Sequence, residues 1–206
     1  TFAFDKQEDS NAQQQYSRIL NAFFFMLGAV CFTVSIFSKE IIFLMTSKAY
    51  WSAYLLRPCI LFGQLAYGIN TIVGYGISFA RKTQYMLIAT TCGAGLNIIL
   101  NFIFIPEYGM VATAATTLIS YVLMVTLSYI FSQRVYPCEY RILRIVLWGI
   151  ILFIVSQIVM NATIGLKIVV WLGISIFLVA TFKDVVGDIS KLVRMCIGWV
   201  RNGKKR

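Results

Sequence analysis

Residues 145–182 read IVLWGIILFIVSQIVMNATIGLKIVVWLGISIFLVATF and contain one charged side chain, that of Lys167. A helix needs about 20 predominantly apolar residues to cross the hydrocarbon core of a bilayer. The stretch is therefore long enough for two crossings. We predict that it forms two transmembrane helices, at 145–162 and 164–182.

Four further apolar stretches of similar length precede this pair, at 19–38, 58–79, 85–105 and 109–131. The sequence thus predicts an all-α membrane protein with about six transmembrane helices. The first helix is expected to continue, tilted, through Ile41–Met45. Pro106 is expected to end the third helix, because proline lacks a backbone N–H, and Tyr108 with Gly109 to form a tight reversal.

The composition agrees with a membrane protein. Hydrophobic residues make up 59% of the chain and charged residues 13%, with a mean hydropathy of +0.79, whereas a soluble domain carries about 25% charged residues. The first 18 residues are polar and show no signal peptide. Because the chain begins at Thr1 and in a polar segment, we expect a loop there and further sequence upstream.

The positions of lysine and arginine predict the orientation, because cytoplasmic loops are enriched in both. Six spans place the two termini on one side of the membrane. That side holds two basic residues in the N-terminal segment, two at 81–82, three between 134 and 144, and seven from Lys183 onward, fourteen in all. The other side holds four. We therefore expect both termini in the cytoplasm, with the net charge of +10 attracting anionic lipids and not nucleic acid.

The five cysteines are scattered without a CxxC pair, and the sequence has no histidine. No metal site, disulfide or cofactor is predicted from this pattern. Two groups of aromatic residues are expected to anchor loops at the membrane surface: Tyr50, Trp51 and Tyr54 on the outer side, and Tyr136 and Tyr140 on the inner side.

The C-terminal segment 183–206 differs from the spans. Its apolar residues recur at i, i+3, i+4 and i+7, which gathers them on one helical face, while Lys191, Arg194 and Arg201 lie off that face. One interpretation is an amphipathic helix on the inner membrane surface that ends in a disordered basic cluster. The other is a plain stop-transfer tail.

Uncharged polar residues recur at helical spacing inside three spans. They are Gln64, Tyr67, Gly68, Thr71, Tyr75 and Ser78 in the second, Thr90, Ala94, Asn97 and Asn101 in the third, and Thr113, Thr117, Ser120 and Ser128 in the fourth. Each set shares a face that should avoid lipid. Such faces either bridge packed helices or line a hydrated cavity. For Gln64, Tyr75, Asn97 and Asn101 both interpretations stay open, and a cavity of this kind would accept a sugar.

Three basic residues at the ends of the second span are candidates for binding a phosphate group of the cargo. Arg57 precedes Pro58 at its outer end, and Arg81 and Lys82 follow its inner end. Arginine offers paired donors to phosphate oxygens, but a topogenic role also explains these residues. Lys167 is expected to extend its ammonium to the outer interface. No Asp or Glu falls inside a span, so the sequence shows no proton relay.

The segment NIILNFIFIPEYGMVATAATTLISYVLM, Asn97–Met124, resembles a characteristic segment of the polysaccharide exporters in the multidrug/oligosaccharidyl-lipid/polysaccharide exporter superfamily. Glu40–Asn70 resembles the helix end, outer loop and helix that precede it in those proteins. Arg81–Tyr85 lies where they carry a short basic inner turn. The likeness covers roughly residues 1–130. Val111-Ala112-Thr113 and Thr46-Ser47 depart from the family pattern.

The resemblance implies a two-lobed flippase in the bacterial inner membrane. Residues 1–131 would form most of its second lobe, 132–182 two additional helices and 183–206 the basic tail. The implied cargo is an undecaprenyl-diphosphate-linked oligosaccharide for surface polysaccharide synthesis, moved without making or breaking a bond. Anionic lipids and other polysaccharide-assembly membrane proteins are the implied partners.

Two other functions are kept as alternatives. The first is a cation-coupled multidrug exporter of the same superfamily, which predicts an intramembrane carboxylate. The second is a membrane enzyme such as a polysaccharide polymerase, which needs a positioned acid, base or nucleophile. Because the chain has no histidine and no carboxylate within a span, the sequence favours a transporter over an enzyme.

Overall fold

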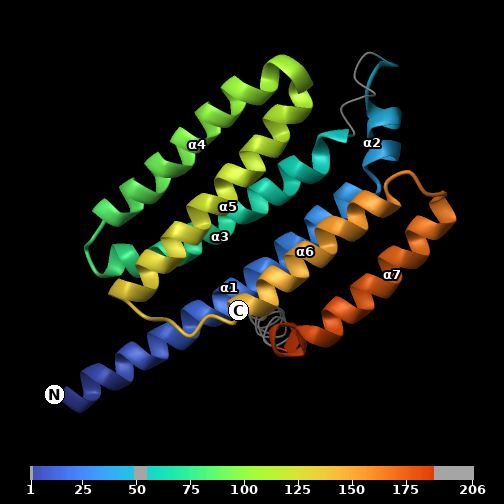
Figure 1. Ribbon diagram of the computed structural model, residues 1–206. Helices are drawn as coiled ribbons and strands as arrows, with labels where there is room; N and C mark the ends of the chain where they lie inside the picture. Colours follow the sequence, from blue (N-terminus) through green and yellow to red (C-terminus); the bar gives the residue numbers. More distant parts are fainter. Residues whose placement is uncertain (1, 49–54, 188–206) are drawn as a thin grey trace, which may run out of the picture.

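The computed structural model describes residues 2–48 and 55–187, and within these ranges the chain is helical without strands (Figure 1). The helices are α1 (Phe2–Ile36), α2 (Ser38–Met45), α3 (Arg57–Phe79), α4 (Gln84–Tyr108), α5 (Met110–Val135), α6 (Ile142–Val159) and α7 (Ile164–Thr181). Within the described ranges, six of them are long and apolar enough to cross a membrane, namely all but α2. This confirms the predicted all-α membrane fold.

The first helix differs from its prediction at both ends. It begins at Phe2, so most of the polar N-terminal segment is helical and not a loop; the part long and apolar enough to cross a membrane is Gln13–Ile36. It does not continue through Ile41–Met45, because the chain breaks at Phe37 (φ −86°, ψ 12°) and restarts as the separate helix α2. Hydropathy registers apolar residues and not the direction of the chain, so it could not distinguish a tilted helix from a broken one.

The turn between α4 and α5 is confirmed in part. Pro106 does not end its helix, because α4 continues to Tyr108. A proline in the last turn of a helix removes only one backbone hydrogen bond. The reversal itself is made by Gly109, which has φ 57° and ψ −134°, a region that is essentially restricted to glycine. The amide of Gly109 closes α4 by donating to the carbonyl of Ile105 at 2.9 Å.

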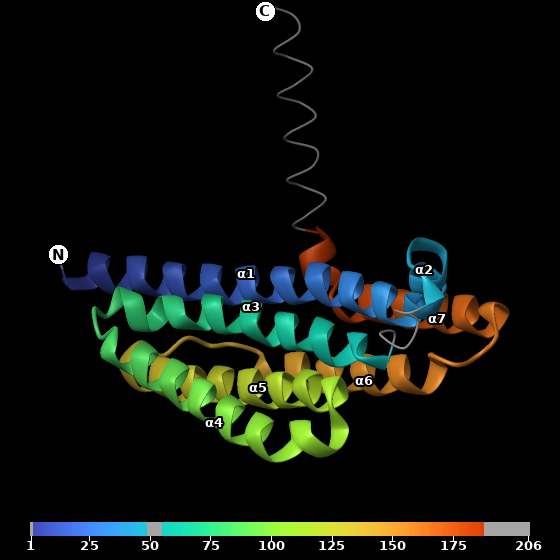
Figure 2. The ribbon, with the colours of Figure 1, turned by 90° about the horizontal axis from the view of Figure 1, so that it is seen from above.

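The helices form two groups that meet along α1 and α3 (Figures 1 and 2). In one group α5 packs against both α3 and α4, and in the other α1 packs against α6 and α7. The apolar core lies where the groups join and includes Phe24 and Phe32 of α1, Val73 of α3 and Leu152 of α6. Helices α4 and α7 are the least buried of the spans, so most of their apolar surface is not covered by the described part of the chain.

Small residues allow α5 to approach its neighbours closely. Its buried face repeats every four residues, with Ala112, Thr116, Ser120, Met124, Ser128 and Ser132. A Cβ built on Gly93 of α4 would lie 3.1 Å from Met124 Cβ and 3.3 Å from the Ser120 carbonyl oxygen. Close approach at small residues is a common way for transmembrane helices to associate. The predicted stripe of α5 therefore divides: Ser120 and Ser128 are buried, whereas Thr113 is exposed.

Two sequence predictions lie partly outside the described residues. The outer aromatics Tyr50, Trp51 and Tyr54 belong to 49–54, and only residues 183–187 of the tail are described, as helix. On the inner side, the prediction that Tyr140 anchors the chain at the membrane surface is wrong. This residue is 9% exposed, and its ring packs in the core with Tyr129. Burial raises the pKa of Tyr140.

Candidate functional site

One face of α3 is polar from Gln64 to Ser78 and is largely exposed in the described part of the chain. It carries Gln64, Tyr67, Thr71, Tyr75 and Ser78, which are all exposed, and we call it the α3 polar face. The opposite face of the same helix is buried, with Ala66, Asn70, Val73 and Ile77. The intervals of three and four residues in both sets follow the helical repeat, so the sequence pattern alone separates the two faces.

Aromatic contacts fix the α3 polar face between α1 and α5. The ring of Tyr75 stacks on Tyr16 of α1, with centroids 6.3 Å apart and planes at 19°. The ring of Tyr67 lies 5.4 Å from Tyr121 of α5. Both tyrosines are still about half exposed, at 49% for Tyr67 and 53% for Tyr75. The face is therefore a strip of amide, hydroxyl and phenol groups bordered by two helices.

A polar strip of this length is unfavourable against acyl chains. The residues belong to the span Arg57–Phe79, and a polar group in hydrocarbon loses the hydrogen bonds that water would offer. The favourable environments are water or another polar protein surface. The exposed side of α4 differs, since it is mostly apolar, with Ile98, Phe102 and Ile103. The α3 polar face thus suits water or a polar protein surface, whereas the outer side of α4 suits apolar surroundings.

Asn97 and Asn101 form a contact between α4 and α5. The amide of Asn101 donates to Asn97 Oδ1 at 3.0 Å, and Thr116 of α5 donates its hydroxyl to Asn101 Oδ1. Both asparagines are half-buried. Of the two interpretations of these residues, helix bridging has direct geometric support.

The three basic candidates lie at opposite ends of α3. The guanidinium of Arg57 donates to the carbonyl of Ser38, the first residue of α2. Arg81 and Lys82 are exposed in the turn after α3, where Arg81 has φ 54°, rare for a residue other than glycine. This conformation lets the Lys82 amide donate to the Ile77 carbonyl at 3.2 Å. Arg57 is thus engaged within the protein, whereas Arg81 and Lys82 face outward.

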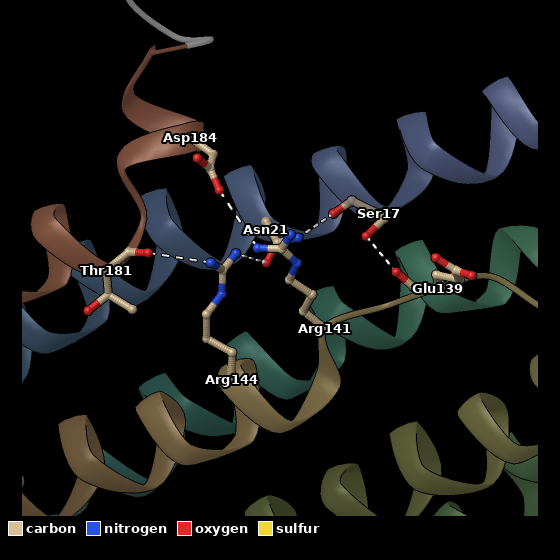
Figure 3. A network of polar contacts seen from close by, with 7 residues as sticks. All are labelled: Ser17, Asn21, Glu139, Arg141, Arg144, Thr181 and Asp184. Carbon is tan, nitrogen blue, oxygen red and sulfur yellow. Dashed lines mark hydrogen bonds and ion pairs between the residues drawn. The ribbon is translucent and has the colours of Figure 1, made fainter.

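A polar network ties α1, α6 and the end of α7 together (Figure 3). Arg144 donates to Asn21 Oδ1 at 2.8 Å and to the Thr181 carbonyl at 3.4 Å, and its guanidinium lies 4.3 Å from the ring centroid of Phe182. Beside it, Arg141 pairs with Asp184 at 3.7 Å. In the sequence both arginines counted only toward topology. The contact between Arg144 and Asn21 spans 123 positions, and no local pattern signals it.

At the other end of the bundle, Lys167 differs from its prediction. Its side chain is fully buried, and its ammonium lies 2.7 Å from Glu40 Oε1 of α2. One turn further along α7, the indole of Trp171 donates to Thr33 Oγ1 of α1 at 2.9 Å. Lys167 does not extend to the interface, because a carboxylate from a helix far away in the sequence reaches it. This pair was missed, since Glu40 is at a helix end and α2 was not predicted.

The fold and these sites define a multi-pass α-helical membrane protein. It has a charged cluster at each end of the bundle and an uncovered polar face on a central span. Comparison of the chain with known proteins finds no matching family model, no matching curated protein and no matching solved structure.

Proposed function

We propose that the chain is part of a flippase that moves an undecaprenyl-diphosphate-linked oligosaccharide across the bacterial inner membrane for surface polysaccharide synthesis. The observation that carries the proposal is the α3 polar face, an uncovered strip of neutral polar groups within a span. Amides, hydroxyls and phenols both donate and accept hydrogen bonds, which suits a cargo rich in sugar hydroxyls. In this proposal the strip lines the hydrated path of the glycan.

The turn after α3 supports binding of the diphosphate. Arg81 and Lys82 are exposed at the end of the α3 polar face that the charge distribution assigns to the cytoplasm, where a lipid-linked sugar made inside the cell would first be met. Arg57 is a weaker candidate, because its guanidinium already donates to the Ser38 carbonyl. The inner pair is therefore the proposed phosphate contact, and Gln64 and Tyr75 are proposed sugar contacts.

Deletion and complementation test the proposal. Deleting the gene should remove lipid-linked sugar repeats from the outer leaflet and surface polysaccharide from the cell. Complementation with the double variant Gln64→Leu and Tyr75→Phe should restore about a tenth of the transport, because each lost hydrogen bond contributes about 0.5–1.5 kcal/mol.

Gln157→Leu is the matched control for the glutamine. Gln157 is half-buried on α6, away from the α3 polar face, so this variant should transport normally at equal protein level. Sugar repeats that still appear on the outer leaflet of the deletion strain would refute the flippase.

One observation favours the second candidate, a cation-coupled multidrug exporter. The pair Glu40–Lys167 supplies a partly buried carboxylate, the kind of group that ion coupling needs. Drug sensitivity of the deletion strain, with surface polysaccharide unchanged, would support the exporter over the flippase.

A further inference from the structure

Lys167 is the only charged residue of α7, and it is fully buried at 0% side-chain exposure. Its ammonium lies 2.7 Å from Glu40 Oε1, a distance typical of a charge-assisted hydrogen bond. A buried ammonium is strongly unfavourable without a partner. The Glu40 carboxylate is the partner that offsets the cost of burying this side chain.

Glu40 belongs to a short helix that is distinct from the long helices of the bundle. The break at Phe37 separates α2 from α1, and α2 has only eight residues. Figure 1 shows α2 at the end of the bundle, near the start of α7. The polar contacts of α2 with other helices include Arg57 to the Ser38 carbonyl at its base, and Glu40 to Lys167. The second contact is the one that joins α2 to α7.

The two partners differ in their access to water. The Glu40 side chain is 32% exposed, whereas Lys167 is fully enclosed. Glu40 Oε2 itself is buried and has no hydrogen-bond partner in the described part of the chain, so it is the oxygen at which a proton can be taken up. We propose that Glu40 and Lys167 form a proton-operated latch, which holds α2 against α7 while both are charged and releases α2 when Glu40 takes up a proton. The latch does not depend on the proposed cargo.

The charges around Glu40 set the direction of the pH dependence. Lys167 faces it from α7 and Lys39 lies next to it on α2, while Arg57 of α3 contacts the carbonyl two residues earlier. Burial acts to raise the pKa of Glu40, but the hydrogen bond and charge of Lys167, together with Lys39, leave it below the ordinary 4.5. A lowered carboxylate pKa means that the latch is closed above the ordinary value and is lost as the pH falls through the lowered value.

Spin labels on α2 and α7 measure the latch directly. Leu44 and Ile176 are exposed, at 88% and 69%, and each is replaced by cysteine in a chain whose five native cysteines are substituted. The labelled chain, in nanodiscs and without any substrate, should give one narrow distance at pH 7. The distribution should broaden and move to longer distances as the pH falls below about 4.5.

Variants separate the latch from a general effect of acid. Glu40→Gln should give the long, broad distribution already at pH 7, and the charge exchange Glu40→Lys with Lys167→Glu should restore the narrow one. Glu107→Gln, which removes an exposed carboxylate at the end of α4, is the matched control and should behave as the unmodified chain. A Glu40→Gln chain with the narrow distance at pH 7, or one no different there from the Glu107→Gln control, would overturn the latch. Because no cargo is present, neither result bears on the flippase.

Discussion

The amide of Asn101 is shared between a neighbour one turn away and a hydroxyl on the next helix. It donates to Asn97 and accepts from Thr116, so its polarity is used for contact between helices. In membranes such contacts are modest, about 0.6 kcal/mol on average and up to about 1.7 kcal/mol, because polar groups also find partners in the unfolded state. At the residue scale, the same chemistry that suggests a sugar site also serves to join α4 and α5.

A double-mutant cycle tests this role of Asn101. Asn101→Leu and Thr116→Val should each destabilise the protein, and their coupling energy should be about 0.5–1.5 kcal/mol, because each substitution removes the hydrogen bond that the two residues share. The measurement is the free energy of unfolding in bicelles titrated with a denaturing detergent.

The matched control for this cycle pairs Asn101→Leu with Thr126→Val. The hydroxyl of Thr126 is exposed and donates to the Val122 carbonyl of its own helix at 2.7 Å, so its coupling with Asn101 should be zero within error. Equal coupling in both cycles would contradict a direct contact between Asn101 and Thr116.

At the scale of the helices, packing depends on where α4 and α5 carry small residues. Gly93 lies against Ser120 and Met124 of α5, whereas a Cβ on Gly173 of α7 would meet nothing within 4 Å. Both glycines are inside helices, so a substitution has the same effect on helix propensity at either position. Any difference between them therefore measures packing alone.

Gly93→Val should destabilise the protein by about 1–3 kcal/mol relative to Gly173→Val, because the added side chain must displace a backbone carbonyl at 3.3 Å. Unfolding in detergent, monitored by circular dichroism, gives both values. If the two variants unfold at the same detergent fraction, α4 and α5 do not approach each other as the structure describes.

At the scale of the whole molecule, turns alternate between the two ends of the bundle. The turn at 80–83, the segment 136–141 and the end of α7 lie at one end, while the turn at Gly109, the segment 160–163 and α2 lie at the other (Figure 1). The more basic end is the first one. From the positive-inside rule we therefore predict that this end faces the cytoplasm.

Single-cysteine labelling tests this orientation. Glu107→Cys and Asn161→Cys should react with a membrane-impermeant maleimide in intact cells, whereas Arg81→Cys and Lys183→Cys should react only after the cells are opened. All four positions are exposed, so accessibility within the protein does not limit the reaction. Labelling of Lys183→Cys in intact cells would reverse the predicted topology.

The sequence alone determined the number and approximate position of the spans and the polar side of α3. Both follow from local chemistry: about 20 apolar residues fill the bilayer, and residues three or four apart share a helix face. The break at Phe37 could not be predicted in this way, because a broken helix and a tilted helix have the same hydropathy. The sequence also misplaced the end of α4. Pro106 was expected to end this helix, but a proline is tolerated in its last turn.

Only the tertiary structure decided which polar groups meet. Lys167 and Glu40 are separated by 127 positions, and Arg144 and Asn21 by 123. The Lys167 side chain, taken alone, is best solvated by water or lipid headgroups, and so was expected at the interface. The fold brings hydrogen-bond donors and acceptors from distant parts of the chain together, away from solvent. There a partner lowers the free energy of a charge whose burial would otherwise be unfavourable. The sequence states which residues are polar, but the packing of helices distant along the chain determines their partners.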